Sequence, residues 1–246
     1  MRTLVAIPVY NEDRYVSRVI SEVTRHASDV LVIDDGSDDQ TPCLLAKLPV
    51  DVIRHAYNRG YGRSIRDAFQ WASCYGYDWL ITMDCDEQHE PESLPDFLNA
   101  IAQNDCDIVS GSRYLESNGG PDQPPEDRRR INTEISKKIN NYLNLSITDA
   151  FCGFKAYRVE SLRKLHLTED GYAMPLQLWI QAAANDLRIK ELAIQLIYRD
   201  RNRSFGGPLD DPEHRLAHYL DVFDAELERF HGKFLEAVAG GGPDRP

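Results

Sequence analysis

The first half of the chain alternates between short apolar segments and segments whose apolar residues have helical spacing. The apolar segments predict strands at Thr3–Val9, Val30–Ile33, Val50–Arg54, Trp79–Met83 and Asp107–Ser110. A strand, a crossover helix and a further strand wind right-handedly, which places the strands parallel in one sheet. We therefore expect an α/β fold with a mostly parallel sheet flanked by helices. Ligands of such sheets bind at the carboxyl ends of the strands.

The second half of the chain is expected to add further helices and two extended segments. One helix is expected where Ile131, Ile135, Ile139, Tyr142 and Leu143 form a single apolar face. Two more are expected at Leu176–Ala184 and after Pro212. Extended structure is expected at Phe151–Tyr157 and Ile189–Tyr198. The resulting boundaries are 1–207 for the α/β domain, 208–236 for a C-terminal helical extension and 237–246 for a disordered tail.

The last helix has apolar residues at the spacing of a heptad repeat. They are Leu216, Leu220, Phe223, Leu227, Phe230 and Phe234. This spacing predicts an amphipathic helix that packs on the domain or on a partner subunit. A homodimeric coiled coil is therefore one of the alternatives.

Two aspartates, Asp84 and Asp86, follow the apolar strand that begins at Trp79. Alternation along an extended backbone puts both carboxylates on the same side. Two like charges this close repel each other, and a divalent cation with oxygen ligands would hold them together. The amide oxygen of Gln88 would be a third ligand. The alternative is a solvated acidic turn before the helix that starts near Pro91.

The charge balance excludes one class of partner. Lys and Arg number 28 against 40 for Asp and Glu, and the net charge is −12. Proteins that bind nucleic acid owe most of their affinity to neutralised phosphates, so we expect no nucleic-acid partner.

The five cysteines have no zinc-ligand spacing and are expected to be reduced, buried thiols. Because no apolar run reaches 18 residues and no signal-like segment is seen, we expect a cytoplasmic protein.

Arginines are concentrated in two short tracts, Arg128–Arg130 and Arg199–Arg203. The planar guanidinium suits bidentate recognition of phosphate. Acids that hold a cation, facing arginines that hold anions, would form a site for a diphosphate and a second anionic group. Ordinary solvated surface is the alternative for each tract taken alone. No Walker loop, dinucleotide fingerprint or nucleophile elbow is present.

Six motifs occur in a characteristic order between residues 3 and 207. They are Ile7–Glu12, Ile33–Ser37, Asn58-x-Gly60-x-Gly62, Met83–His89, Gly111–Tyr114 and Thr148–Ala156. In this order they resemble the inverting family 2 glycosyltransferases, and within them the dolichol-phosphate mannose synthase branch. The resemblance implies a GT-A fold, in which a mostly parallel, Rossmann-like sheet is flanked by helices. It also implies metal-dependent transfer of a hexose from a GDP-mannose or UDP-glucose type of donor to a polyprenyl or dolichyl phosphate.

The resemblance further implies roles for individual residues. The donor site would comprise Pro8, Tyr10, Glu12, Ile33, Asp35, Asp84, Cys85, Asp86, Arg201 and Arg203. Asp84, Asp86 and Gln88 would hold Mg or Mn against the donor diphosphate. The acceptor phosphate would face Arg113, with Arg130 as its companion. The expected catalytic residues are Asp86, Arg113, Arg130 and Asp149.

The chain departs from the branch after Arg201, where family members often carry a lysine on a closing loop. Here Arg203 is the candidate replacement for that lysine. A phosphate acceptor is already an anion and needs no strong base, whereas a neutral hydroxyl acceptor would need one, and Asp149 is the candidate. The face Ile131–Leu143 could lie against a membrane, which would make the protein peripheral at its inner face, or it could face the core.

Other functions remain compatible with the pattern. The same donor chemistry could act on a soluble hydroxyl acceptor. A nucleotidyltransferase also uses a parallel sheet and metal-binding acids, although the early glycine- and lysine-rich loop of that class is not seen. A non-catalytic protein that binds sugar nucleotides is the third alternative.

Overall fold

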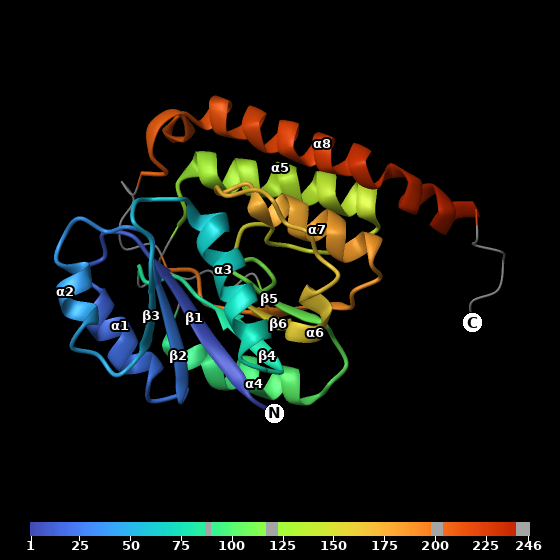
Figure 1. The fold of residues 1–246 in the computed structure, drawn as a ribbon. Helices are drawn as coiled ribbons and strands as arrows, with labels where there is room; N and C mark the ends of the chain where they lie inside the picture. The colour runs from blue at the N-terminus through green and yellow to red at the C-terminus, as the bar shows by residue number, and fades with distance from the viewer. Residues whose placement is uncertain (87–89, 117–122, 198–203, 240–246) are drawn as a thin grey trace.

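The computed structural model describes residues 1–86, 90–116, 123–197 and 204–239. They form one seven-stranded sheet with the strand order β3-β2-β1-β4-β6-β5-β7. The strands are β1 (Thr3–Val9), β2 (Asp29–Asp34), β3 (Asp51–Arg54), β4 (Trp79–Thr82), β5 (Ile108–Ser112), β6 (Lys155–Arg158) and β7 (Ile189–Ala193). The expected α/β architecture is therefore confirmed, and Figure 1 shows helices packed around the sheet.

One strand runs against the others. β6 pairs antiparallel with both β4 and β5, whereas the remaining pairs in the sheet are parallel. The carboxyl ends of β1, β2, β4 and β5 therefore lie at one edge, and β6 begins at that same edge. This insertion brings the segment before Lys155 next to the end of β4.

Helices cover both faces of the sheet. On one face lie α1 (Val16–Val23), α2 (Thr41–Leu45) and α4 (Leu94–Ala102), and on the other lie α3 (Tyr61–Cys74), α6 (Val159–Leu162) and α7 (Met174–Ala184). Two short 3-10 helices, η1 (Pro91–Ser93) and η2 (Gly207–Asp210), precede α4 and α8. Strand β1 shows why both faces are apolar: Val5 and Ile7 face α1, and Leu4 and Ala6 face α3.

A third layer consists of α5 (Glu126–Leu143) and α8 (Pro212–Ala239), which lie beside α7 (Figure 1). Leu216 and Phe223 of α8 share a buried cluster with Ile135 of α5 and Trp179 of α7. The heptad face of α8 therefore packs against α5 and α7 of the same chain. Buried Glu226 of α8 also accepts hydrogen bonds from two amides of α7, and this network fixes the helix in place.

The structure decides between two alternatives for α5 and corrects other expectations. Ile131, Ile135 and Ile139 are buried in the protein, so this face of α5 faces the core and does not lie against a membrane. Tyr142, which the sequence pattern places on the same face, is 60% exposed. Cys43 and Cys74 are exposed rather than buried, while the other three cysteines are buried as expected.

Two segment boundaries also differ from the expectation. Strand β7 ends at Ala193, earlier than the expected Tyr198, which lies outside the described residues. Helix α8 continues to Ala239, past the expected end at 236, and residues 240–246 lie outside the described part. Among the residues that the structure describes, no helix is both long and apolar enough to span a bilayer.

Candidate active site

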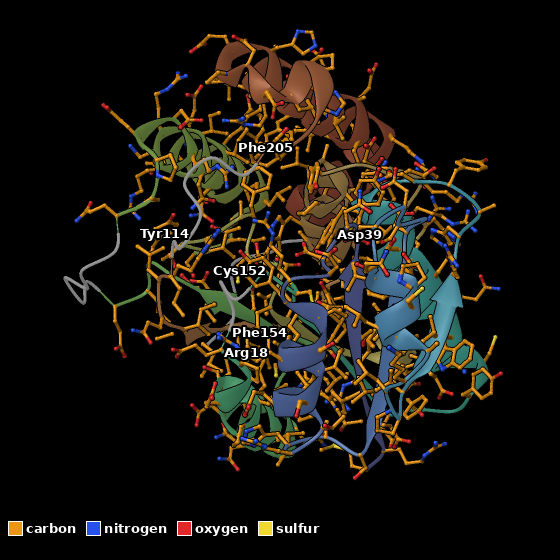
Figure 2. The ribbon with its side chains drawn as sticks, turned by 90° about the vertical axis from the view of Figure 1, so that its left-hand side faces the viewer. Arg18, Asp39, Tyr114, Cys152, Phe154 and Phe205 are labelled. Atoms are coloured by element: carbon orange, nitrogen blue, oxygen red, sulfur yellow. The ribbon has the colours of Figure 1, made fainter. Side chains whose placement is uncertain are left out.

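A cavity of about 890 Å³ opens at the edge of the sheet where β1, β2, β4 and β5 end. Its walls come from the ends of these strands, the start of α3, the first turns of α5 and α8, and the segment 204–206. Tyr114 and Phe205 both line it, and Figure 2 shows Phe205 below α8 and beside α5, with Tyr114 lower and further to the left. The cavity therefore lies where sheets of this kind bind their ligands.

The segment after β1 forms one end of the cavity. Pro8, Tyr10 and Glu12 line this end, as expected for residues at the end of the first strand. Asn11 has a left-handed backbone (φ 57°), and its N–H donates to Ser37 Oγ at 2.9 Å. This contact ties the end of β1 to the segment after β2. Ile33, expected in the base pocket, is instead fully buried against α3, because the alternation of β2 turns it to that face.

Asp35 lines the same end of the cavity, and its carboxylate organises the loop before α3. It accepts hydrogen bonds from the N–H groups of Arg59 and Gly60, each at 2.8 Å. Gly60 has φ 102°, a backbone region that favours glycine, and a side chain there would collide with the 170 carbonyl. His55 joins Asp35 (2.6 Å) to Asp67 (2.9 Å) through its two ring nitrogens. No motif in the sequence indicates a role for His55.

Asp84, Cys85 and Asp86 lie at the end of β4 and line the cavity. Asp84 and Asp86 are partly exposed and Cys85 is buried, as the predicted alternation requires. Behind Asp84 lies Gly153, the residue two before β6: a Cβ on this glycine would lie 2.6 Å from Asp84 Oδ2. The antiparallel insertion of β6 therefore places backbone directly against the Asp84 carboxylate.

A buried cation lies near the same aspartate. Lys155, at the start of β6, is buried and donates to the carbonyl of Cys152. Burial lowers the pKa of Lys155, and the negative charges of Asp149 and Asp84 partly oppose this. The nearby carboxylates of Asp149 and Asp84 therefore favour the charged form of Lys155.

The donor set at this edge suits a hard divalent cation. Carboxylate oxygens are the ligands that Mg²⁺ and Mn²⁺ prefer. In the described ranges, no group of three or more His, Cys, Asp or Glu side chains could hold a metal alone. Asp84 and Asp86 would thus share the ion with oxygens of a bound ligand, as is usual for Mg²⁺ at phosphates. Gln88 lies outside the described residues.

We expect Gly153→Ala to disturb the candidate cation site at Asp84 specifically. The added methyl group would force the Asp84 carboxylate to move, and small misplacements of this kind lower activity by roughly 10–100-fold. Titration of activity with Mn²⁺ should show a higher half-saturating concentration. Gly232→Ala is the matched control, because nothing lies within 4 Å of a Cβ at that position of α8. Unchanged Mn²⁺ dependence in Gly153→Ala would contradict this role of Gly153.

Arg113, just after β5, forms a bidentate ion pair with Asp149. The distances are 2.7 Å from Nε to Oδ2 and 2.9 Å from Nη2 to Oδ1. Burial opposes ionisation of the fully buried Asp149, but the charge and hydrogen bonds of Arg113 outweigh it, so the pKa of Asp149 is lowered. An enclosed carboxylate with a lowered pKa is a poor proton acceptor. The geometry thus argues against Asp149 as a general base and indicates that it positions Arg113, which lines the cavity.

The arginine tract of α5 is oriented differently from the expectation. Arg130 points away from the cavity, is 45% exposed and pairs with Glu213 of α8. Arg128 lines the cavity instead, with its guanidinium carbon 4.6 Å from the centroid of the Phe205 ring. Arg201 and Arg203 lie outside the described residues, so their expected roles stay predictions.

An aromatic wall, which the sequence did not predict, lines the same cavity as the two aspartates. It consists of Tyr61, Phe151, Tyr172, Phe205 and Tyr219. The Tyr61 and Tyr172 rings stack at 5.8 Å, and those of Phe151 and Tyr219 at 4.8 Å. Arg215 of α8, only 3% exposed, belongs to the same wall. The one sequence feature that could have indicated a role for Arg215 is its position directly before Leu216, a residue of the heptad pattern.

Comparison with known proteins identifies related sequences and folds. The family model for glycosyl transferase family 2 matches residues 4–166. Polyprenol monophosphomannose synthase of Mycolicibacterium smegmatis is 34% identical, and the match covers 81% of this chain and 78% of that protein. Undecaprenyl-phosphate mannosyltransferase of Micrococcus luteus is 33% identical over 83% of this chain and 87% of that protein.

A solved structure with a similar fold is glucosyl-3-phosphoglycerate synthase from Mycobacterium tuberculosis, in complex with Mn²⁺, UDP and glucosyl-3-phosphoglycerate. The TM-score is 0.69 at 18% identity, and the match covers 94% of this chain and 80% of that one. This likeness and the mixed sheet confirm the fold class expected from the sequence.

Proposed function

Because the chain belongs to glycosyltransferase family 2, we propose that it moves a hexose, with inversion, from a nucleotide-diphosphate sugar to a polyprenyl phosphate. One observation carries the proposal: a single cavity is lined by two metal-suited aspartates and by arginines and aromatic rings. The names of the two mannosyl-transferring relatives support a lipid phosphate as the acceptor.

The donor would bind between the end of β1 and the end of β4. Pro8, Tyr10 and Glu12 would contact the nucleoside, and the loop that Asp35 organises would close its other side. Asp84 and Asp86 would hold the cation at the diphosphate. A Mg²⁺ or Mn²⁺ ion, when bound, would neutralise the charge that develops on the departing nucleoside diphosphate.

The acceptor would enter along the opposite wall. A phosphate oxygen would attack the anomeric carbon and form a new C–O bond, while the C–O bond to the donor diphosphate breaks. Because a phosphate monoester is an anion near neutral pH, this step needs no proton acceptor, which agrees with the pairing of Asp149 to Arg113. The rings of Phe151, Phe205 and Tyr219 would accommodate an isoprenyl chain.

The lipid acceptor implies action at a membrane surface. We propose that the protein works as a peripheral enzyme on the cytoplasmic side, where a polyprenyl phosphate presents its head group. The cavity would take up that head group while the distal part of the chain stays in the bilayer.

The test is a transfer assay with GDP-mannose or UDP-glucose as donor and farnesyl phosphate, a short isoprenyl monophosphate, as acceptor. We expect a metal-dependent glycosyl phosphate product with one of the two donors. A parallel thermal-shift series with GDP and UDP, with and without Mn²⁺, should show which base stabilises the protein. Transfer to 3-phosphoglycerate but not to farnesyl phosphate, or binding of a donor without any turnover, would contradict the proposal.

A further inference from the structure

We infer that His55 is a positioning residue for the sugar nucleotide. It holds the carboxylate of Asp35, which lines the cavity, and is itself held by Asp67 of α3. Neither His55 nor Asp67 lines the cavity, so both would act on the donor only through Asp35. The inference rests on the proposed function, in which the loop organised by Asp35 closes one side of the nucleoside. It extends the donor site to two residues that lie behind the cavity wall.

His55 lies where three elements of the fold meet. It follows β3, the strand at the edge of the sheet, and its backbone N–H donates to the carbonyl of Asp34 at 2.9 Å. This bond continues the pairing of β3 with β2 by one residue. The ring then contacts Asp35, directly after β2, and Asp67, within α3. His55 therefore joins the ends of two strands to the helix that follows them.

Each ring nitrogen of His55 faces a carboxylate oxygen. Nδ1 lies 2.6 Å from Asp35 Oδ1, and Nε2 lies 2.9 Å from Asp67 Oδ2. An ionised carboxylate only accepts hydrogen bonds, so both contacts form when both nitrogens carry a proton. The ring is then a cation between two anions, which makes both bonds charge-assisted. With Arg63, which donates to Asp67 Oδ2 at 2.9 Å, the charges of the four side chains balance.

The bond from His55 helps to set the orientation of the Asp35 carboxylate. Oδ1 accepts from His55 and from the N–H of Arg59, while Oδ2 accepts from the N–H of Gly60. A carboxylate bound from three directions has little freedom to rotate. Asn58 and Gly60 line the cavity together with Asp35. A rotated carboxylate would therefore release this loop and change the cavity wall itself.

Asp67 gives His55 a rigid support. It accepts from Nε of Arg63, one turn earlier in α3, and the backbone N–H of Arg63 donates to the carbonyl of residue 170 at 3.1 Å. Gly62, in the first turn of the same helix, packs against the segment 169–171, where a Cβ would lie 2.5 Å from a backbone oxygen. The start of α3 is thereby fixed, so the position of Asp67 does not depend on a bound ligand.

The sheet separates this group from the acceptor side of the cavity. His55 and Asp35 follow β3 and β2, whereas Arg113 follows β5. In the strand order, β1, β4 and β6 lie between β2 and β5. A change at His55 should therefore weaken binding of the donor and leave binding of the acceptor nearly unchanged, because a preorganised site loses affinity where its own groups become mobile.

The experiment compares two amide substitutions of His55, each of which keeps one of its two contacts. The amide nitrogen of Asn lies as many bonds from the backbone as Nδ1, so His55→Asn keeps a donor for Asp35. By the same count, the amide nitrogen of Gln replaces Nε2, so His55→Gln keeps only the donor for Asp67. Calorimetry with Mn²⁺ measures the binding of GDP and of UDP to the full chain.

For the nucleotide that binds the wild type, we expect His55→Gln to weaken binding roughly 10–100-fold, because Asp35 loses a charge-assisted hydrogen bond. His55→Asn should weaken it by no more than about fivefold. In the transfer assay, the KM for the donor should rise in the same order. The KM for farnesyl phosphate should stay within about twofold of the wild-type value.

Asp67→Asn tests the support behind the ring. It should weaken nucleotide binding by about as much as His55→Asn, and the double substitution should be no worse than either, because both remove the same contact. Asp107→Asn is the matched control: the side chain of Asp107 is 14% exposed, as is that of Asp67, and it pairs with Arg158 and Arg188 away from this cavity. It should leave nucleotide binding unchanged.

Equal losses in His55→Gln and His55→Asn, or an equal rise in both KM values, would show a role in the fold alone and overturn the inference. So would wild-type nucleotide binding by His55→Gln, or a wild-type protein that binds neither nucleotide. If His55→Gln does not fold, Asp67→Asn and Asp107→Asn decide, and equal effects of these two would overturn the inference. Nucleotide binding of the expected pattern without transfer to any acceptor would contradict the proposed function and support the role of His55.

Discussion

Asp84→Asn is expected to lower kcat by roughly 10²–10³-fold, the loss that follows when a preorganised charge at the reacting group is removed. The substitution keeps the shape of the side chain and removes its charge. Asp84 is partly exposed and faces the cavity, so the fold should tolerate the change. Stabilisation by nucleotide with Mn²⁺ should fall to the level seen with nucleotide alone. Steady-state rates and thermal shifts measured on the same preparation test both parts.

Asp86→Asn should behave similarly, since both carboxylates lie at the end of β4. Asp105→Asn is the control for a general loss of negative charge, because Asp105 precedes β5 at the opposite edge of the sheet and pairs with Lys190. If Asp84→Asn kept the wild-type response to Mn²⁺, these aspartates would not be the cation site.

Asp149→Ala is expected to lower the free energy of unfolding by about 3–5 kcal/mol, because it leaves the Arg113 guanidinium largely buried without its counter-charge. Denaturant titration measures this change. Glu213→Ala removes the exposed partner of Arg130 and should change stability by less than about 1 kcal/mol. Equal effects of the two substitutions would show that the buried Arg113–Asp149 pair stabilises the fold no more than the exposed Arg130–Glu213 pair.

The pH dependence of stability gives an independent check on the same pair. Because the folded protein lowers the pKa of Asp149, this carboxylate stabilises the fold above its ordinary pKa of about 3.9. That contribution is lost as the pH falls through the lower, folded-state pKa. The stability difference between wild type and Asp149→Ala should therefore be constant near neutral pH and should shrink below about pH 4. A difference that persists unchanged at pH 3 would contradict this ionic role.

The local features of the fold could be predicted from the sequence. The strand that ends at Thr82 and the acids that follow it are both encoded by neighbouring residues, since alternation and strand ends are short-range signals. The direction of β6 was not predictable, because a short buried strand has the same pattern whether its neighbours are parallel or antiparallel. Yet this direction places Gly153 against Asp84.

The arginine side of the site depends on long-range packing. Residues 128 and 130 lie about 200° apart around a helix, so the rotation of α5 decides which one faces the cavity. Arg215 reaches the cavity through contacts with Asp127, a residue 88 positions earlier in the chain. The spacing of residues along the sequence predicts neither the rotation of α5 nor the contact between Arg215 and Asp127. The family resemblance likewise pointed to Arg130, which the structure turns toward Glu213.

The placement of α8 has a consequence for how such an enzyme could diversify. Among the described residues, the groups proposed to bind the sugar nucleotide come from the first 86 residues, whereas α8 supplies part of the aromatic wall from the far end of the chain. Substitutions in one terminal helix could then redirect the protein toward a different lipid or a water-soluble recipient while the donor-binding residues stay unchanged. Grafting the equivalent helix between relatives would be a direct way to exchange what receives the sugar.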